Sequence, residues 1–590
     1  MLDLRVYRAA FVPALLAFVI TAFSLGSPPR AATTTLAPDA FQGSRAFGSL
    51  GRLADAYPAR RPGGPGDEAL ARSVAAQMRA TGLQVTSDRF SGRTIDGDRT
   101  LTNVVGVRPG SLTSRRIVVI AHRDAAARGS EAALSGTAAL LELARVYGGR
   151  ALRRTLVLVS TSGGSGGDAG ARELARHPGG PVDGVIVLGD MAGRTLRSPH
   201  VVPWSNTEGV ASLELQRTVS RALRLEAGLP ERGASAPAQW MRLGIPLTAG
   251  EQGEVVPERT AAVLLSASGE RGPGAEHSVT EGRLNDFGRA ALRAITALDG
   301  RHGGSLGVRA QVVSGNNVLP AWSVWLLVGA LLLPVFVSAI DAFARASRRR
   351  QPMVAWLVWA GTSALPFLLA AAVALLLGVI GLLPAAPHAP VADGAAKFGA
   401  AGWACLGAVV LVGVAAFPLR RYLLAALGLR TGAGSPGETL GAGAAVALLA
   451  AMLALGVWLA NPFAAALLVP GAHIALFVAA PEVRLRRWLA LALLVVAALP
   501  GLVAVVYYSR QFGLSPAQVP ATMLQVVAGG HFGIAGLLAW SYVLGALACL
   551  TVMATSQRPL DAEPPLVVTR GPRTYAGPGS LGGTESALRR

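Results

Sequence analysis

Cysteine and lysine are almost absent from this 590-residue chain, which has two Cys and, in Lys397, a single Lys. Both cysteines, Cys405 and Cys549, fall inside long apolar runs. We therefore expect no disulfide in the more polar first half of the chain, although an oxidising compartment would permit one. Charged residues make up only 15% of the chain, and its mean hydropathy is +0.45.

Charge is scarcest after about residue 318, where Ala, Leu, Val and Gly dominate. A helix needs roughly 20 apolar residues to cross about 30 Å of hydrocarbon. Runs of about that length predict an integral membrane protein with an all-α membrane domain of about eight transmembrane helices. The runs cover residues 7–26, 320–342, 353–383, 398–419, 438–460, 462–481, 487–508 and 529–554.

Arginines flank these runs asymmetrically, and all the clusters lie on one side of a membrane if the N-terminus is inside. We therefore expect a multi-pass protein of the cell membrane, with both termini cytoplasmic and residues 31–318 extracytoplasmic. Arg510 is the exception, since it would lie outside. The clusters are Arg5 and Arg8; Arg348, Arg349 and Arg350; Arg420, Arg421 and Arg430; Arg484, Arg486 and Arg487; and Arg558, Arg570 and Arg573.

The formal charge of +20 raises the question of nucleic-acid binding. Much of the excess is arginine beside the apolar runs, and the sequence lacks the interleaved basic and aromatic residues of an RNA- or DNA-binding surface. We therefore expect the lipid bilayer, and no nucleic acid, as a partner.

The chain divides by composition into segments. Residues 1–30 are expected to be a signal anchor; the alternative, a cleaved signal peptide, is disfavoured because Arg30 and two prolines interrupt the cleavage site. Residues 557–590, rich in Pro, Gly and Arg, are expected to be a disordered cytoplasmic tail. Between them we expect a tether at 31–41, an α/β domain at 42–300, a linker at 301–318 and a seven-helix membrane domain at 319–556.

Residues 42–300 alternate between helical and strand patterns, which predicts an α/β sheet with helices on both faces. Functional sites in such sheets form where loops leave the carboxyl ends of strands. His122, Asp124, the 162–167 loop and Asp190 all fall at such ends. The expected helices are 68–82, 136–147 and 168–177, and the expected strands are 103–108, 116–121, 154–160 and 184–189.

Several motifs follow one another in a fixed order along this domain. They are His122-Arg123-Asp124 after a strand, the Gly129–Gly136 loop before a helix, a glycine-rich loop after Ser160, Asp190 at a strand end, Gly244-Ile245-Pro246, and His277 before the last helix. In this order they resemble the zinc aminopeptidase family that includes the leucyl aminopeptidases, glutaminyl cyclases and glutamate carboxypeptidases. The resemblance covers about residues 42–300, and it implies an aminopeptidase-like mixed sheet fused to the multi-span membrane region.

The resemblance also implies roles for individual residues. His122 and Asp190 match two ligands of one metal, His277 matches a ligand of the other, and Asp124 matches the carboxylate that orients the first His. The acidic residues of the family are replaced at four matched positions: the bridging aspartate by Ala132, the general-base glutamate by Gly164, the glutamate ligand by Ser165, and the aspartate before Gly-Ile-Pro by Ala236.

These replacements remove the groups that the family's chemistry needs, because two metals and a glutamate together activate the attacking water. Catalytic zinc generally uses three protein ligands, and neither half of the matched site retains three. We therefore expect no cofactor, with zinc as the metal to consider if the residual site binds one. Glu131 and Asp168 lie near the replaced positions and would rescue the site if they took over as ligands.

Simpler interpretations stay open for the same residues. His122 fits a core histidine hydrogen-bonded to Asp124, and Asp190 fits a loop-capping residue. The glycine-rich run 163–167 lacks the Lys-Ser/Thr ending of a phosphate loop and predicts a backbone turn with positive φ.

The favoured hypothesis is an integral membrane protein whose zinc-aminopeptidase-like domain is catalytically inactive and serves as a binding or complex-subunit module, for example for a peptide or an envelope protein. The alternative is an active membrane-anchored metallo-aminopeptidase that cleaves N-terminal residues of peptides. A transporter that depends on His473, an ionisable residue inside an apolar run, is a third candidate.

Overall fold

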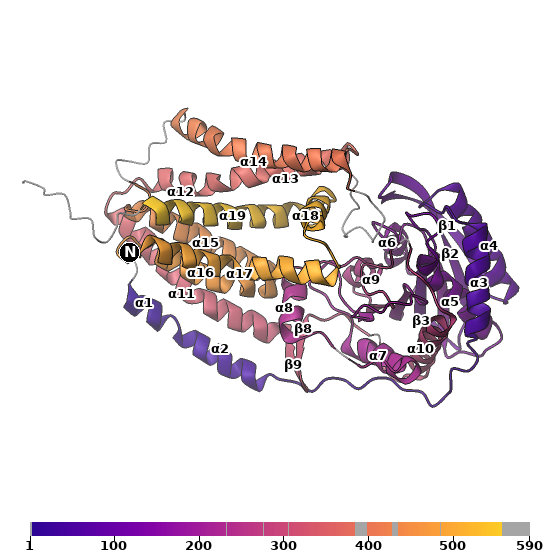
Figure 1. Cartoon of the computed structure of the whole chain (residues 1–590). Coiled ribbons are helices and arrows are strands. Elements are labelled where there is room, and N and C mark those ends of the chain that lie inside the picture. Colours follow the sequence, from indigo (N-terminus) through magenta and orange to yellow (C-terminus); the bar gives the residue numbers. More distant parts are fainter. Residues whose placement is uncertain are drawn as a thin grey trace, which may run out of the picture.

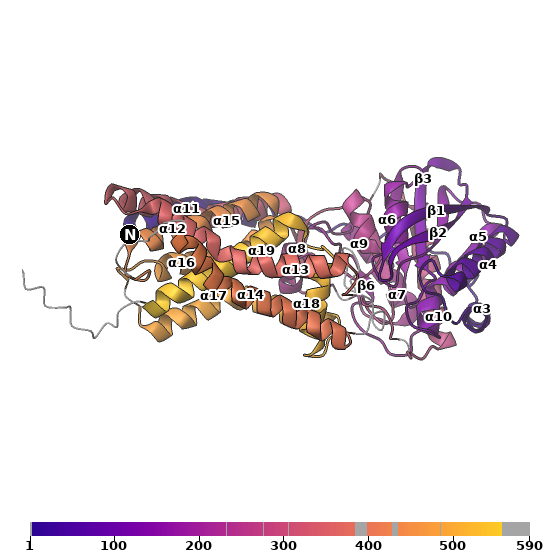
Figure 2. The ribbon, with the colours of Figure 1, turned by 90° about the horizontal axis from the view of Figure 1, so that it is seen from above.

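The computed structural model describes residues 3–231, 233–274, 276–304, 306–383, 398–426, 435–483 and 485–556. An α/β domain and a bundle of long apolar helices lie end to end (Figures 1 and 2). Some residues of the sequence analysis lie outside the described residues: the tail at 557–590 with Arg558, Arg570 and Arg573, and also Lys397, Arg430 and Arg484.

The α/β domain is built on a mixed sheet of seven strands in the order β1-β2-β4-β3-β5-β7-β6. The parallel pairs are β3/β4, β3/β5 and β5/β7, whereas β1/β2, β2/β4 and β6/β7 are antiparallel. The strands are β1 (Gln84–Thr94), β2 (Gly97–Arg108), β3 (Leu112–His122), β4 (Arg154–Thr161), β5 (Val182–Leu188), β6 (Val201–Val202) and β7 (Ala262–Leu265).

Helices cover both faces of this sheet, because successive residues of a strand point to opposite faces. Ile117, Val119 and Ala121 of β3 belong to one buried core, with α3 (Gly43–Ala56), α4 (Pro65–Ala80), α5 (Glu131–Gly148), α7 (Leu213–Ala227) and α10 (Glu281–Gly300). Val118 and Ile120 belong to a second core that includes α8 (Ala236–Gly244) and continues into the helical bundle. The remaining helices of the domain, α6 (Ala169–Arg176) and α9 (Gln252–Val255), lie on the bundle side (Figure 1). The predicted fold, a mixed α/β sheet with helices on both faces, is confirmed.

Seven helical segments in the described part of the chain are long and apolar enough to cross a membrane. One expected span, 462–481, appears as the shorter α16 (Pro462–Val478) of 17 residues, which begins at Pro462 just after Asn461. The seven are Leu4–Phe23 (α1, Leu4–Ala9, and α2, Val12–Phe23), α11 (Ala321–Arg348), Met353–Val379 (α12, Met353–Gly361, and α13, Leu365–Val379), α14 (Ala400–Ala426), α15 (Leu440–Ala460), α17 (Arg487–Gln511) and α19 (Gly533–Ser556); α18 (Gln518–Ala528) is a short helix beside them.

The N-terminal helix is fixed to the bundle by polar contacts. Asp3 Oδ2 lies 3.0 Å from Arg345 Nη2 near the end of α11. His473 in α16 is hydrogen-bonded on both ring nitrogens, to the Tyr7 hydroxyl at 2.8 Å and to the Leu331 carbonyl at 3.0 Å. The N-terminus and the end of α11 thus lie together at the end of the bundle remote from the α/β domain (Figure 1).

The two connections between bundle and α/β domain run side by side. A β-bridge joins Gly26, which follows α2, to Val318 in β9 (Asn317–Pro320), the strand that precedes α11. Strand β8 (Gln311–Ser314) forms a hairpin with β9, so the segment expected as a linker at 301–318 is partly a sheet. Within the segment expected as a tether at 31–41, the Ala32 N–H donates to Thr218 Oγ1 of α7 at 2.9 Å.

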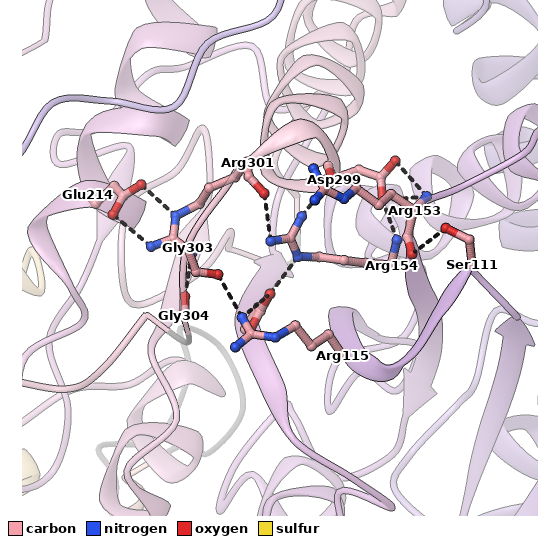
Figure 3. Close-up of polar contacts among 10 residues, drawn as sticks. Ser111, Arg115, Arg153, Arg154, Glu214, Asp299, Arg301, Gly303 and Gly304 are labelled. Atoms are coloured by element: carbon pink, nitrogen blue, oxygen red, sulfur yellow. Dashed lines mark hydrogen bonds and ion pairs between the residues drawn. The ribbon is translucent and has the colours of Figure 1, made fainter.

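A network of arginines holds the end of α10 against the starts of the central strands (Figure 3). Arg154 Nε lies 2.5 Å from Asp183 Oδ2, and its two terminal nitrogens donate to the carbonyls of Asp299 and Arg301 at 2.6 and 2.8 Å. Arg115 Nη1 approaches the same Asp183 from the surface at 3.1 Å. This network fixes the helix from which the chain continues toward the membrane helices.

Candidate functional site

An open cleft lies at the carboxyl ends of β3, β4 and β5, and its space together with the adjoining open solvent measures about 670 Å³. The predicted residues His122, Asp124, Gly164, Ser165 and Asp190 all line it. Two acidic residues that the sequence analysis did not select, Glu251 and Glu270, line it as well. Glu251 follows the Gly-Ile-Pro motif by a few residues. Its closeness to that motif in the sequence is the signal from which it could have been predicted as a residue of the cleft.

His122 is paired with Glu251. Its Nδ1 lies 3.7 Å from Glu251 Oε2, and Thr161 Oγ1 donates to Glu251 Oε1 at 2.5 Å. Burial acts to lower the pKa of His122, but the polar contact with Glu251 and its charge outweigh burial, so the pKa is raised. A raised pKa disfavours metal binding by His122, because ligation needs the neutral imidazole.

Asp124 is engaged with the glycine-rich loop. Its Oδ1 accepts the N–H groups of Gly163 and Gly164 at 2.8 and 3.0 Å, and its Oδ2 accepts the N–H of Ser165 at 2.9 Å. No hydrogen bond between Asp124 and His122 occurs in the described part of the chain. The carboxylate therefore fixes the loop that follows β4, and Glu251 is the group that contacts the imidazole.

The glycine-rich loop makes the predicted turn, with φ of 92° at Gly163 and 93° at Gly167. The turn brings Gly164 against His122: a Cβ atom at Gly164 would lie 2.4 Å from the His122 Cβ and 2.6 Å from its Cγ. Real Cβ atoms do not approach other heavy atoms that closely. The backbone at position 164, which the resemblance matches to the family's general base, is thus compatible with glycine and not with glutamate.

Asp190 caps the loop that follows β5. Its Oδ1 accepts the N–H groups of Ala192 and Gly193 at 3.0 and 2.7 Å, and Ser135 Oγ approaches it at 3.3 Å. Its Oδ2 is buried and meets no donor among the described residues. Burial raises the pKa of Asp190, although the two backbone donors, the neighbouring Ser268 hydroxyl and nearby His277 act in the opposite direction. His277 Nε2 is likewise buried with no hydrogen-bond partner in the described ranges.

The two rescue candidates occupy different surroundings. Glu131 is the exposed first residue of α5. Asp168 is 1% exposed and sits in the left-handed region, with φ of 46°. Burial, together with repulsion from Glu251 and Glu254, raises the pKa of Asp168 well above its usual value. Asp168 thus lies close to Glu251, and neither of its carboxyl oxygens has a hydrogen-bond partner among the described residues.

The donor set does not fit a pair of catalytic zinc ions. Among the described residues, no three His, Cys, Asp or Glu side chains are grouped so that they could hold a metal ion. Ala132 is buried in the first turn of α5, and the replacements at Gly164 and Ser165 also offer no carboxylate. Catalytic zinc sites need three protein ligands, and His122 is already paired with Glu251.

Comparisons with known proteins relate this domain to a peptidase family. Residues 103–230 match the profile described as Peptidase family M28. A search of curated proteins gives no match. Among solved structures, glutaminyl cyclase from Porphyromonas gingivalis is 16% identical, with 43% of this chain and 98% of that chain covered and a TM-score of 0.36. A leucine aminopeptidase precursor from Bacteroides thetaiotaomicron is 18% identical, with 43% and 97% covered and a TM-score of 0.35. BSAP, a zinc aminopeptidase from Bacillus subtilis, is 10% identical, with 47% and 99% covered and a TM-score of 0.36.

The resemblance that the motifs predicted is confirmed at the level of the family. Residues 103–230 of the α/β domain match the model of Peptidase family M28, and the domain is joined to a bundle of apolar helices long enough to cross a membrane.

Proposed function

We propose that the α/β domain is a non-catalytic binding module carried by a membrane protein. The observation that carries this proposal is the closure of the glycine-rich loop on His122, where a Cβ at position 164 would lie 2.4 Å from the His122 Cβ. A glutamate base has no room there, and the histidine is engaged by Glu251. Hydrolysis needs both an activated water and a base that accepts its proton.

The polar atoms of the cleft suggest the chemistry of its ligand. Asp190 Oδ2 and the hydroxyls of Ser165 and Ser266 are buried, line the cleft and have no hydrogen-bond partner among the described residues. Glu251 Oε2 also lines the cleft, and His122 Nδ1 approaches it at 3.7 Å, which is longer than a hydrogen bond. Buried carboxylate oxygens without donors are costly, so a ligand that supplies donors and positive charge is favoured. A primary ammonium has three donors and no acceptor. We therefore propose that the cleft takes the amino group of a peptide or of an envelope protein.

The positions of the arginines at the ends of the helices indicate on which side of the membrane the domain lies. We propose that the domain is extracytoplasmic in the cell membrane, because Arg348 and Arg349 at the end of α11 lie with the N-terminus, away from the domain, and arginine-rich ends stay in the cytoplasm.

Catalysis is tested with purified full-length protein equilibrated with zinc and then freed of excess metal. We expect no stoichiometric zinc by mass spectrometry and no turnover of amino-acid arylamides. The active-peptidase alternative requires the opposite result: one or more zinc ions per chain, with turnover that is lost in His122→Ala.

Binding is tested by titrating the tripeptide Leu-Gly-Gly, with a free amino group, into the full-length protein in detergent micelles. We expect Glu251→Gln to weaken binding about tenfold or more, since a hydrogen bond to a charged group contributes roughly 1.5–3 kcal/mol. N-acetylated Leu-Gly-Gly is expected not to bind. Glu231→Gln, at an ion pair with Arg224 remote from the cleft lining, is the control and should leave affinity unchanged. Equal affinity for the free and acetylated peptides would exclude amine recognition.

A further inference from the structure

The turn after α8 is held by polar side chains from the membrane helices. Asn461 Nδ2 donates to the carbonyl of Leu243 at 2.7 Å, and the Tyr508 hydroxyl donates to the carbonyl of Ile245. His531 Nε2 lies 2.8 Å from the carbonyl of Pro246. The Gly-Ile-Pro segment of the α/β domain is therefore bound by α17 and by the loops before α16 and α19.

Arg242, on the same helix α8, is fully buried between the two parts of the molecule. Its Nη1 lies 2.8 Å from Glu270 Oε1, its Nη2 contacts Glu270 Oε2, and its Nε donates to the Tyr507 hydroxyl at 3.0 Å. Four aromatic rings surround the guanidinium, with centroids 5.0–5.8 Å from its central carbon; they belong to Trp204, Tyr507, Tyr508 and Phe512. Aromatic faces stabilise a desolvated cation, and most of these rings come from α17 or the residue that ends it.

Glu270, the partner of Arg242, is also a wall of the cleft. It is 2% exposed, so its charge depends on Arg242 for compensation. The next residue, Arg271, donates from Nη1 to the carbonyl of Phe512 at 3.4 Å. The 269–273 wall therefore faces the cleft on one side and α17 on the other.

We propose that membrane helix α17 sets the shape of the cleft through Arg242 and Glu270, so that the position of α17 and the state of the cleft wall are coupled. If α17 moves, Arg242 loses its hydrogen bond to the Tyr507 hydroxyl and three of its four rings, and the counter-charge of Glu270 is then held less firmly. Coupling of this kind is reciprocal, since any ligand that rearranges the wall acts back on the helix by the same factor. The coupling goes beyond the proposed function and does not depend on which ligand the cleft takes.

The test is hydrogen–deuterium exchange of the full chain in lipid nanodiscs, read out on peptides that cover residues 262–274 and 243–250. Tyr507→Phe removes one hydroxyl from a membrane helix and leaves the α/β domain's own sequence unchanged. We expect amide exchange in both peptides to rise about five- to tenfold, the effect of one lost buried hydrogen bond, while strand β3 keeps its protection. Arg242→Gln is expected to raise exchange in the same peptides further.

Arg224→Gln is the matched control, because it removes an arginine from a half-exposed ion pair with Glu231 and should leave both peptides unchanged. If Arg242→Gln raises exchange throughout the domain, including β3, that variant reports unfolding and Tyr507→Phe alone decides. Unchanged exchange at 262–274 in Tyr507→Phe would overturn the proposal.

Discussion

At the scale of single residues, Asp168 is the clearest source of pH-dependent stability. Its carboxyl group is buried beside Glu251 and Glu254, and its pKa is raised in the folded state. At a pH below about 3.9, the pKa of an aspartate in the unfolded chain, such a carboxyl is protonated in both states and does not change the free energy of unfolding. As the pH rises from there toward the pKa in the folded protein, the carboxyl lowers the free energy of unfolding progressively. At a pH above the folded-state pKa, each unit of difference between the two pKa values lowers the free energy of unfolding by about 1.4 kcal/mol.

We therefore expect Asp168→Asn to stabilise the α/β domain at pH 8 and to have little effect at pH 4. Asparagine also tolerates the left-handed backbone found at this position. Thermal unfolding followed by near-UV circular dichroism at both pH values checks this. An equal shift of Tm at the two pH values would show that the carboxyl does not titrate with folding.

Gly164 is a residue at which the structure leaves no room for a side chain. We expect Gly164→Ala to destabilise the domain by about 1–3 kcal/mol, the usual cost of overpacking, because the new Cβ would meet His122. Gly51→Ala in α3 is the control: no described atom lies within 4 Å of a Cβ there, and alanine in a helix gains up to about 1 kcal/mol over glycine. Urea unfolding of both variants makes the comparison; equal stability would mean that the loop moves away from His122 at little cost.

Part of the site could be predicted from the sequence at this scale. His122, Asp124 and Asp190 were selected because they end apolar strands, and all three line the cleft. Glu251 and Glu270 were not selected, because each lies in a loop without periodicity and its neighbours become visible only in three dimensions. The buried pair Arg123–Asp67, with 2.8 Å between Nε and Oδ1, was missed for the same reason, since nothing local marks Asp67 as a partner.

At the scale of elements, the central strands were predictable and the hairpin at the sheet edge was only half predicted. Strand β4 is buried along its whole length and, after Arg154, is a continuous run of apolar and Thr or Ser residues. Strand β1 is mostly exposed and rich in Ser, Thr and Arg, so it lacks the apolar alternation that marks a strand. Strand β1 is defined instead by its backbone pairing with β2, which extends over eleven residues.

The arginine network of Figure 3 gives a prediction for the junction of α10 and the sheet. We expect Arg154→Met to cost about 3 kcal/mol, because removing one partner of a buried ion pair leaves the other charge uncompensated. Arg115→Gln is the matched control: Arg115 contacts the same Asp183 but is 34% exposed, and exposed pairs contribute at most about 1 kcal/mol. Equal losses in chemical unfolding would contradict the ranking of the two arginines.

Asn461 has two separable roles at the start of α16. Its Oδ1 caps the helix by accepting the N–H groups of Phe463 and Ala464 at 2.9 and 3.1 Å, and its Nδ2 donates to the carbonyl of Leu243. We expect Asn461→Asp to keep the cap and lose the donor, and Asn461→Ala to lose both, the cap alone contributing about 1 kcal/mol. Exchange at 243–250 should rise in both variants, whereas exchange at the start of α16 should rise only in the alanine variant. Protection of 243–250 in the aspartate variant would show that this contact does not hold the turn.

At the scale of the whole molecule, the existence of two parts was predictable, but their contact was not. Composition separates an α/β domain from a helical bundle, and apolar length identifies the helices. Tyr507, Tyr508 and Phe512 belong to the end of an apolar run, and the sequence does not distinguish rings that face lipid from rings that face a buried arginine. The second core of the sheet continues into the bundle through Val324 and Phe463, a continuity between residues far apart in the chain that local patterns do not encode.

The bridge between Gly26 and Val318 places the entry and exit of the α/β domain at a single point. A protease that cuts one of the two chain segments connecting the domain to the bundle therefore leaves the domain attached through the other segment. Release of the domain from the helical bundle would require two cuts, so a nicked molecule would stay in the membrane fraction and separate into fragments only after denaturation.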